Sequence, residues 1–163
     1  MYEIDKTDLE IVNLLLENGR MSASEISRRM GDVSERSIRY RIERMREENI
    51  LQIGVVVRPE AFGLLIKADV WLEVESDHIR EVAQKMTEFE KVTYVACSIG
   101  ENDISIQVVA RDTDEVYRFV TETVRKIPGV RRTTTSIVPL ILKDVHQWRI
   151  PESIIKPPKG RES

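Results

Sequence analysis

The apolar residues of this chain change their spacing after Asn49. Before that residue they recur every three or four positions, as they do on amphipathic helices. After it, runs with the alternation of strands are interleaved with two further helical stretches. A chain of 163 residues can hold one ordinary domain or two small ones. The change of spacing therefore predicts a helical region followed by a mixed one.

Three short helices are expected in the first region. Each begins with a residue whose side chain can accept a hydrogen bond from the first helical turn, and these N-caps are Asp5, Ser22 and Ser34. The third helix has an apolar inner face formed by Ile38, Ile42 and Met45. A turn containing Gly31 connects it to the second helix. Two short helices joined by such a turn, the second rich in arginine, are typical of a helix-turn-helix.

The second region predicts an α+β domain. The strands are expected at 66–74, 92–99, 104–110 and 130–142, and the helices are expected to be capped by Asp77 and Asp112. This βαββαβ order is that of a ferredoxin-like domain, in which both helices cover one face of an antiparallel sheet. Because the opposite face also needs a cover, a second copy of the domain is the simplest candidate. Trp71 is expected in the core or at that dimer interface.

The predicted fold class is α+β, an N-terminal three-helix (winged) helix-turn-helix followed by a ferredoxin-like βαββαβ α/β sandwich. The expected domains are a helix-turn-helix DNA-binding domain at 1–49, a strand linker or hinge at 50–63, a ferredoxin-like dimerisation domain at 64–143, and a tail at 144–163. Within the linker, a strand is expected at 50–57 and a helical turn at 60–63. The last dozen residues of the tail are expected to be mobile.

Positive charge is concentrated in one segment. The whole chain has a formal net charge of −3, which argues against a protein that is basic all over. Eight arginines and only four acids, with no lysine, lie between Arg20 and Arg46. Arginine pairs with phosphate and guanine as a planar fork, whereas lysine acts as a point charge. This pattern favours contact with double-stranded DNA through one face.

Other features exclude several classes of protein. Charges interrupt every apolar run before it reaches the ~20 residues of a membrane helix, and the acidic N-terminus does not resemble a signal peptide. A single cysteine, Cys97, cannot form an internal disulfide and is expected in the core. We therefore expect a cytoplasmic protein. The two histidines lack metal-ligand spacing, and no nucleotide or nucleophile motif is present, so no metal, cofactor or enzymatic activity is expected.

The exposed face of the third helix is the candidate for reading DNA. Arg36, Ser37 and Tyr40 lie at its N-terminal part, which in such motifs contacts base edges. Ser34 and Arg39 are placed for phosphates. Arg44 is interpreted either as a backbone contact or as a partner of Glu47 or Glu48. The alternative for the whole face is a solvated surface of helical ion pairs, worth only ~0.3–0.5 kcal/mol each.

Several motifs together resemble the Lrp/AsnC (leucine-responsive and asparagine-responsive, or feast/famine) family of transcription regulators. In chain order they are IDKTD at 4–8, NGR at 18–20, EIS at 25–27, VS at 33–34, RIERMREE at 41–48, GENDI at 100–104 and PGV at 128–130, followed by Thr133 and Thr135. The resemblance implies homodimers joined through the open sheet face, often assembled into octamers. It also implies that an amino acid or related metabolite binds between dimers, modulating assembly or DNA affinity.

The resemblance places this effector at Gly100, Asn102, Asp103, Thr133 and Thr135. The first three also form the Gly/Asn/Asp turn that a β-hairpin requires. An enzymatic alternative is open, because sirohaem decarboxylases of the haem pathway share both halves of this fold. Their hallmark is a histidine-containing stretch at the hairpin loop, where this chain has GEND. A dimer that has lost its DNA-binding surface is a third possibility.

Overall fold

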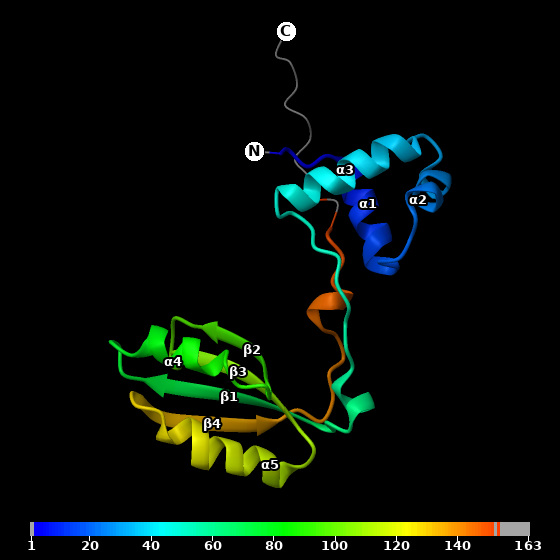
Figure 1. Cartoon of the computed structure of the whole chain (residues 1–163). Coiled ribbons are helices and arrows are strands. Elements are labelled where there is room, and N and C mark those ends of the chain that lie inside the picture. The colour runs from blue at the N-terminus through cyan, green and yellow to red at the C-terminus, as the bar shows by residue number, and fades with distance from the viewer. Residues whose placement is uncertain (1, 152, 154–163) are drawn as a thin grey trace. The chain divides into compact units, whose positions relative to one another are not determined.

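The computed structural model describes residues 2–151 and 153 (Figure 1). The chain divides into two compact units, one formed by Met1–Val56 with Lys143–Ser163 and the other by Val57–Leu142. The expected mobility of the last dozen residues concerns positions that, apart from Ser153, lie outside the described residues. Among the described residues, no helix combines the length and the apolar character needed to cross a bilayer.

The first unit holds the three expected helices, α1 (Lys6–Glu17), α2 (Ala23–Met30) and α3 (Glu35–Glu47). All three predicted N-caps are confirmed, because the side chains of Asp5, Ser22 and Ser34 each accept a hydrogen bond from a backbone N–H three residues on. The helices enclose a small core of fully or nearly fully buried side chains: Ile11, Leu15, Met21, Ile26, Ile38 and Met45. This core sets how α3 is presented to solvent.

The strand expected at 50–57 is wrong. The segment is irregular, and within the described residues no backbone group of residues 52–57 has a backbone hydrogen-bond partner. A strand requires a neighbour that completes its ladder, and this single chain offers none. The described part of the first unit therefore carries no β-wing. The expected helical turn follows as the 3-10 helix η1 (Pro59–Phe62).

The second unit is the ferredoxin-like domain that the sequence predicts. Its elements are β1 (Ile66–Val74), α4 (Ile79–Met86), β2 (Val92–Cys97), β3 (Ile104–Ala110), α5 (Thr113–Arg118) and β4 (Val130–Ile137). The strands lie in the order β2-β3-β1-β4, and all three pairings are antiparallel. Alternate residues of β1 and β3 are buried in a core shared with α4 and α5, which leaves the other sheet face open.

Three expected boundaries in this unit are wrong for local reasons. β4 ends at Ile137, because Val138 makes its last backbone bond, to Lys67 at the start of β1, and Pro139 has no N–H to donate. β2 ends at Cys97, where the turn toward β3 begins. The N-cap of α4 is His78, which makes no side-chain cap bond, and the Asp77 carboxylate is instead hydrogen-bonded to the His78 ring. By contrast, Asp112 caps α5 as predicted.

The helix α5 changes its geometry partway. After Arg118 the chain continues as a π-helical turn, η2 (Phe119–Thr123), and then as a 3-10 turn, η3 (Val124–Lys126). The inward residues Phe119, Val120 and Val124 stay buried throughout. Single π-helical turns occur frequently at functional sites, and this one lies over β4.

Gly129 provides a test of the packing between β4 and α4. Its φ is +85°, and an added Cβ would lie 2.5 Å from the Cβ of His78. The G129A variant should lose about 1–2 kcal/mol from left-handed strain and more from the clash. Gly63 is the matched control, because its φ is +80° with open space around it. Urea unfolding followed by circular dichroism should show a larger loss for G129A than for G63A; equal losses would contradict this packing.

Candidate functional site

The turn between α2 and α3 determines where the third helix begins. Gly31 adopts a φ of +80°, which ends α2. Ser27 on α2 then donates a hydrogen bond from Oγ to the carbonyl oxygen of Val33, at 2.6 Å. Ser34 accepts from the backbone N–H of Ser37 and opens α3. These short-range contacts give the two helices a defined connection.

The outward face of α3 carries the residues predicted to read DNA. Arg36 and Tyr40 are exposed, and Tyr40 keeps 65% of its surface accessible. Ile38 and Met45 on the inward face are fully buried. Ser37 is partly buried beside the cap. The structure thus places Arg36, Ser37 and Tyr40 within the first two turns of one helix.

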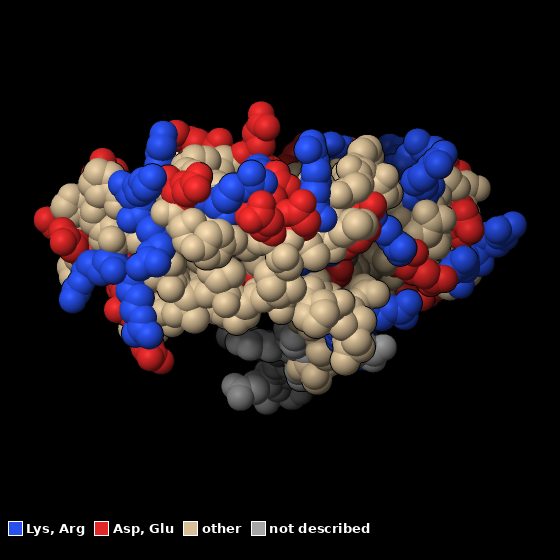
Figure 2. Space-filling model, turned by 90° about the horizontal axis from the view of Figure 1, so that it is seen from below, with Lys and Arg blue, Asp and Glu red and all other residues tan. Residues whose placement is uncertain are grey.

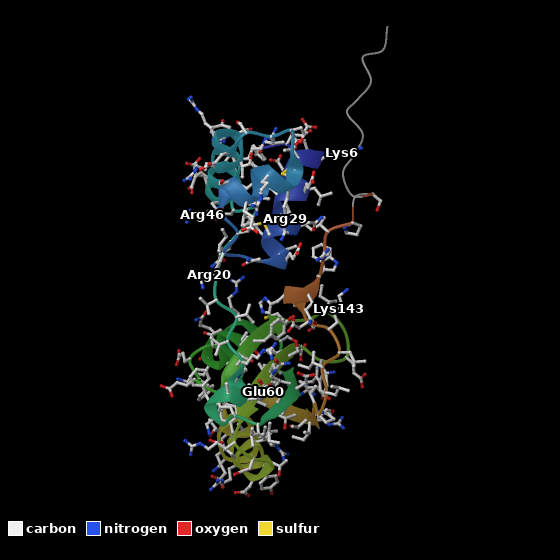
Figure 3. The ribbon with its side chains drawn as sticks, turned by 90° about the vertical axis from the view of Figure 1, so that its right-hand side faces the viewer. Lys6, Arg20, Arg29, Arg46, Glu60 and Lys143 are labelled. Atoms are coloured by element: carbon white, nitrogen blue, oxygen red, sulfur yellow. The ribbon has the colours of Figure 1, made fainter. Side chains whose placement is uncertain are left out.

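The eight arginines of this segment fall into two groups. Five form ion pairs with carboxylates of the same unit: Arg29, Arg39, Arg41, Arg44 and Arg46. Among the described residues, Arg20, Arg28 and Arg36 have no carboxylate partner. Figure 3 labels one member of the second group, Arg20, together with Arg29 and Arg46 on the helical unit. An arginine without a partner is free to meet a phosphate.

Two predicted contact residues already have partners within the helix. Arg39 pairs with Glu35, with its Nε 3.0 Å from the carboxylate. Arg44 lies 3.3 Å from Glu48 and 3.6 Å from Glu47. Of the two roles expected for Arg44, a DNA-backbone contact or an ion pair with one of these glutamates, the single chain therefore shows the ion pair. Exposed pairs of this kind contribute only ~0–1 kcal/mol. They can therefore be exchanged for a phosphate at little cost.

Arg28 is a candidate that sequence reasoning missed. It is exposed in the last turn of α2, close to the turn that leads into α3. Its position on the first helix of the motif could have pointed to it, because that helix crosses the DNA backbone in such modules. Its lack of an ion-pair partner among the described residues becomes visible only in the structure.

Charge elsewhere on the protein is mixed. Figure 2 shows acidic and basic side chains interspersed over the face that it presents. The acidic net charge of −3 fits this picture. The electrostatic argument for nucleic acid therefore depends on the arginines of the first unit alone.

The five predicted effector residues fall into two groups. Thr133 and Thr135 line a cavity of about 590 Å³ between β4 and the helix α5 with its π-helical continuation. The other residues around it include Asp114, Tyr117, Val120 and Arg125. Gly100, Asn102 and Asp103 do not line this cavity. Within one chain, the structure brings together only the two threonines.

Asp103 has a structural role in the single chain. Its Oδ2 accepts a hydrogen bond from the backbone N–H of Val74 at 2.7 Å, and its own N–H donates to Leu72 at 2.9 Å. Its carbonyl oxygen accepts from Ser98. The hairpin loop is thus held to the end of β1, as the turn interpretation requires.

Two remaining polar candidates lie beside α4. Cys97 is exposed, so its expected core position is wrong; it lies at the end of the edge strand β2. His78 lies 2.9 Å from Asp77 and 3.6 Å from Glu75, and the hydrogen bond with Asp77 raises the pKa of its ring. These three side chains are close enough to hold a cation, and their mutual ion pairs account for the same geometry.

Each of the two units matches a known protein family. A family described as the AsnC-type helix-turn-helix domain matches residues 4–46. A second, described as the Lrp/AsnC ligand binding domain, matches residues 67–147. Together they cover most of the chain.

Two relatives represent the sequence matches. An uncharacterized HTH-type transcriptional regulator of Pyrococcus horikoshii is 35% identical over 147 residues, which are 90% of each chain. The HTH-type transcriptional regulator FL11 of Pyrococcus furiosus is 30% identical over 142 residues, covering 86% of this chain and 93% of that one. Both alignments include the two units.

Two solved structures share the fold. Escherichia coli AsnC superposes with a TM-score of 0.80 at 24% identity, covering 89% of this chain and 99% of that one. A transcriptional regulator of Neisseria meningitidis, solved as a complex with L-Met, superposes with a TM-score of 0.82 at 25% identity, covering 91% and 96%. The predicted α+β fold class, a helix-turn-helix followed by a ferredoxin-like domain, is confirmed, except that the described residues form no wing.

Proposed function

The chain belongs to the Lrp/AsnC family of transcription regulators, and on that premise we propose how its two units act. The first unit reads double-stranded operator DNA in the cytoplasm. The second unit binds an amino acid or a related metabolite, which alters assembly or DNA affinity. The observation that supports DNA reading most strongly is the outward face of α3, where Arg36 and Tyr40 stand exposed on a capped helix.

The contacts divide into base and phosphate contacts. Arg36, Ser37 and Tyr40 enter the major groove, where an arginine fork can bind guanine. Phosphate contacts position the helix without reading sequence. The residues that make them are Ser34, Arg39 and Arg44 from the α3 segment, with Arg28 and Arg20 added because they lack carboxylate partners in the described chain.

The open face of the sheet is the proposed dimer interface. Trp71 lies on this face of β1 and is partly exposed. Gln107 on β3 donates a hydrogen bond to Asp69 on β1 at 3.0 Å, which satisfies two polar groups that burial would otherwise leave unpaired. A second copy covers this face by two-fold symmetry, and further assembly of dimers leads to an octamer.

The cavity beside β4 forms one side of the proposed effector site. Thr133 and Thr135 offer hydroxyl groups there. Gly100, Asn102 and Asp103, which lie apart from this cavity within one chain, complete the site from a neighbouring dimer. The L-Met complex of the Neisseria regulator supports an amino acid as the class of ligand.

Replacing both threonines tests this site. In the T133V/T135V variant the shape of each side chain is kept and its hydroxyl is lost. A hydrogen bond to a charged group contributes about 1.5–3 kcal/mol, so the tightest-binding of the twenty amino acids should bind at least 10-fold more weakly in calorimetry. T87V is the control, because Thr87 directly follows α4 and does not line this cavity. Unchanged affinity of T133V/T135V for the amino acid would show that this cavity is not part of the effector site.

We propose that the chain is not an enzyme. The sirohaem-decarboxylase alternative needs a histidine in the hairpin loop between β2 and β3. Residues 98–103 read SIGEND and contain none. No observation on the described residues favours this alternative over a regulator.

A selection experiment tests the proposed function as a whole. Purified protein is incubated with a random duplex library, with and without a mixture of amino acids, and bound DNA is sequenced. The proposal expects an enriched motif with two-fold symmetry and half-sites about one helical turn apart. Recovery of no enriched sequence under either condition would contradict it.

A further inference from the structure

One carboxylate in the first unit is fully buried. Asp8, in the first turn of α1, has 0% of its surface exposed and is the only charged residue so buried among the described residues. Burying a charge is costly unless it is paired and hydrogen-bonded. The partners of Asp8 therefore indicate why it is there.

The side chain of Asp8 has partners in the N-terminal segment before α1 and in α3. Its Oδ1 accepts hydrogen bonds from the hydroxyl of Tyr2 and from Nη1 of Arg41, both at 2.8 Å. Its Oδ2 accepts from the backbone N–H of Asp5 at 3.1 Å. The Arg41 Nη1 also donates to Asp5 Oδ2 at 2.9 Å. The ion pair between Asp8 and Arg41 thus connects α1 to α3 across 33 residues of sequence.

The Asp8–Arg41 pair is less exposed than the other ion pairs of this segment. The Arg41 side chain is 25% exposed, less than those of the other ion-paired arginines in this segment. The bond to Asp8 raises the pKa of Arg41, and burial together with the same carboxylate raises the pKa of Tyr2 to about 12. Arg41 and Tyr2 therefore each keep one charge state at neutral pH.

Arg41 also has a particular place on α3. It directly follows Tyr40 and lies one helical turn beyond Ser37. Its side chain nevertheless points toward α1, because both of its carboxylate partners lie at the start of that helix. It is thus the arginine of α3 that is turned inward, next to the outward reading face.

We propose that Asp8 and Arg41 are positioning residues for DNA recognition. Their ion pair fixes the orientation of α3 relative to α1, so that Arg36, Ser37 and Tyr40 meet the base edges in register. Arg41 itself does not contact DNA. This inference depends on the proposed function, because it concerns the same reading face.

An ion pair suits this task better than an apolar contact. A buried pair adds little stability over well-packed hydrophobic residues of similar size, but it imposes direction on both partners. Apolar contacts have little directionality, and cores tolerate volume-conserving exchanges of aliphatic side chains at small cost. The pair therefore adds directional contacts between α1 and α3 to the orientation that the core already gives α3.

The test compares three variants of the full chain. D8N keeps the size of the side chain and removes its charge, and the double variant D8L/R41M replaces the pair with apolar side chains of similar volume. R46M is the control for loss of an arginine, because Arg46 forms an exposed pair with Glu43 on the same helix. For each, affinity is measured for the selected operator and for scrambled DNA.

The proposal expects D8N and D8L/R41M to bind the operator at least 10-fold more weakly than the parent. Affinity for scrambled DNA and its dependence on salt should not change, and R46M should keep its preference for the operator. Recovery of operator preference by a stably folded D8L/R41M would overturn the proposal, because the pair would then only stabilise the fold. Tighter binding by D8N would also overturn it, since Arg41 would then be a DNA contact that Asp8 restrains.

A second readout separates this inference from the proposed function. Residual dipolar couplings report the angle between α1 and α3 without DNA. The angle should change, or spread over several values, in D8L/R41M. An unchanged angle overturns the positioning role even if the parent binds an operator. A different outcome is also informative. If the parent shows no operator preference but the angle between α1 and α3 changes in D8L/R41M, the proposed function is refuted and Asp8 and Arg41 still orient α3.

Discussion

Removing the side chains of Arg36 and Tyr40, the two exposed residues of the α3 face proposed to read DNA (the reading face), should nearly abolish recognition of the operator. Each good base contact contributes about 1–3 kcal/mol of discrimination, so R36A alone should weaken operator binding about 5- to 150-fold. Arg36 has no carboxylate partner among the described residues and Tyr40 is 65% exposed. Neither side chain has to break an internal contact to meet DNA. R36A/Y40A should therefore lose most of the preference over scrambled DNA.

The measurement is fluorescence anisotropy with operator and scrambled duplexes at one salt concentration. R46A is the matched control, since Arg46 lies on the same helix in an exposed pair with Glu43. Loss of a base contact lowers affinity for the operator and leaves affinity for scrambled DNA nearly unchanged. If R36A lowered the affinity for both duplexes by the same factor, Arg36 would be a phosphate contact. If R36A/Y40A bound the operator as tightly as the parent does, α3 would not read the bases through this face.

Truncating Ile38 should unfold much of the first unit. The side chain is fully buried on α3 and packs in the small core of that unit. Replacement by alanine removes apolar contacts and leaves a cavity, at a cost of about 2–5 kcal/mol. A unit of this size has little stability to lose. I38A should therefore lose operator binding altogether while the ferredoxin-like unit stays folded.

Hydrogen exchange followed by mass spectrometry checks this result segment by segment. In I38A, protection should fall across α1, α2 and α3 and persist in β1 and β3. The control is I38V, which should cost about 0.5–1.5 kcal/mol and keep DNA binding. Loss of protection in both units together would show that they unfold cooperatively, which contradicts two separate cores.

Local features of the sequence predicted the fold well. The N-caps at Asp5, Ser22, Ser34 and Asp112 are confirmed, because capping depends on residues only three positions apart. Strands β1 and β3 begin and end where their apolar alternation does. These two strands lie in the middle of the sheet, so their own pattern determines what they bury.

Features that depend on distant partners were not predictable in the same way. The segment 50–57 has the composition of a strand and no neighbour to pair with in this chain. Cys97 follows an apolar run, yet it lies at the end of an edge strand and is exposed. The eight arginines look alike in sequence, and only the structure separates those with carboxylate partners from Arg20, Arg28 and Arg36.

The proposed effector site illustrates the same limit. Thr133 and Thr135 share a face of β4 because alternate residues of a strand do so, and the cavity that they line needs α5 to form its other wall. The loop residues Gly100 to Asp103 are placed by the end of β1. In the proposed site, the loop meets Thr133 and Thr135 of another copy of the chain, and the sequence of one chain does not define that contact.

The most direct test of DNA reading by the first unit is the salt dependence of operator binding by the parent protein. Each phosphate neutralised on B-DNA adds about −0.9 to the slope of log affinity against log salt concentration. A dimer that places the arginines of two helical units on DNA should show a slope of several units, together with a preference for the operator at every salt concentration. A flat salt dependence, or equal affinity for scrambled DNA throughout, would contradict the account.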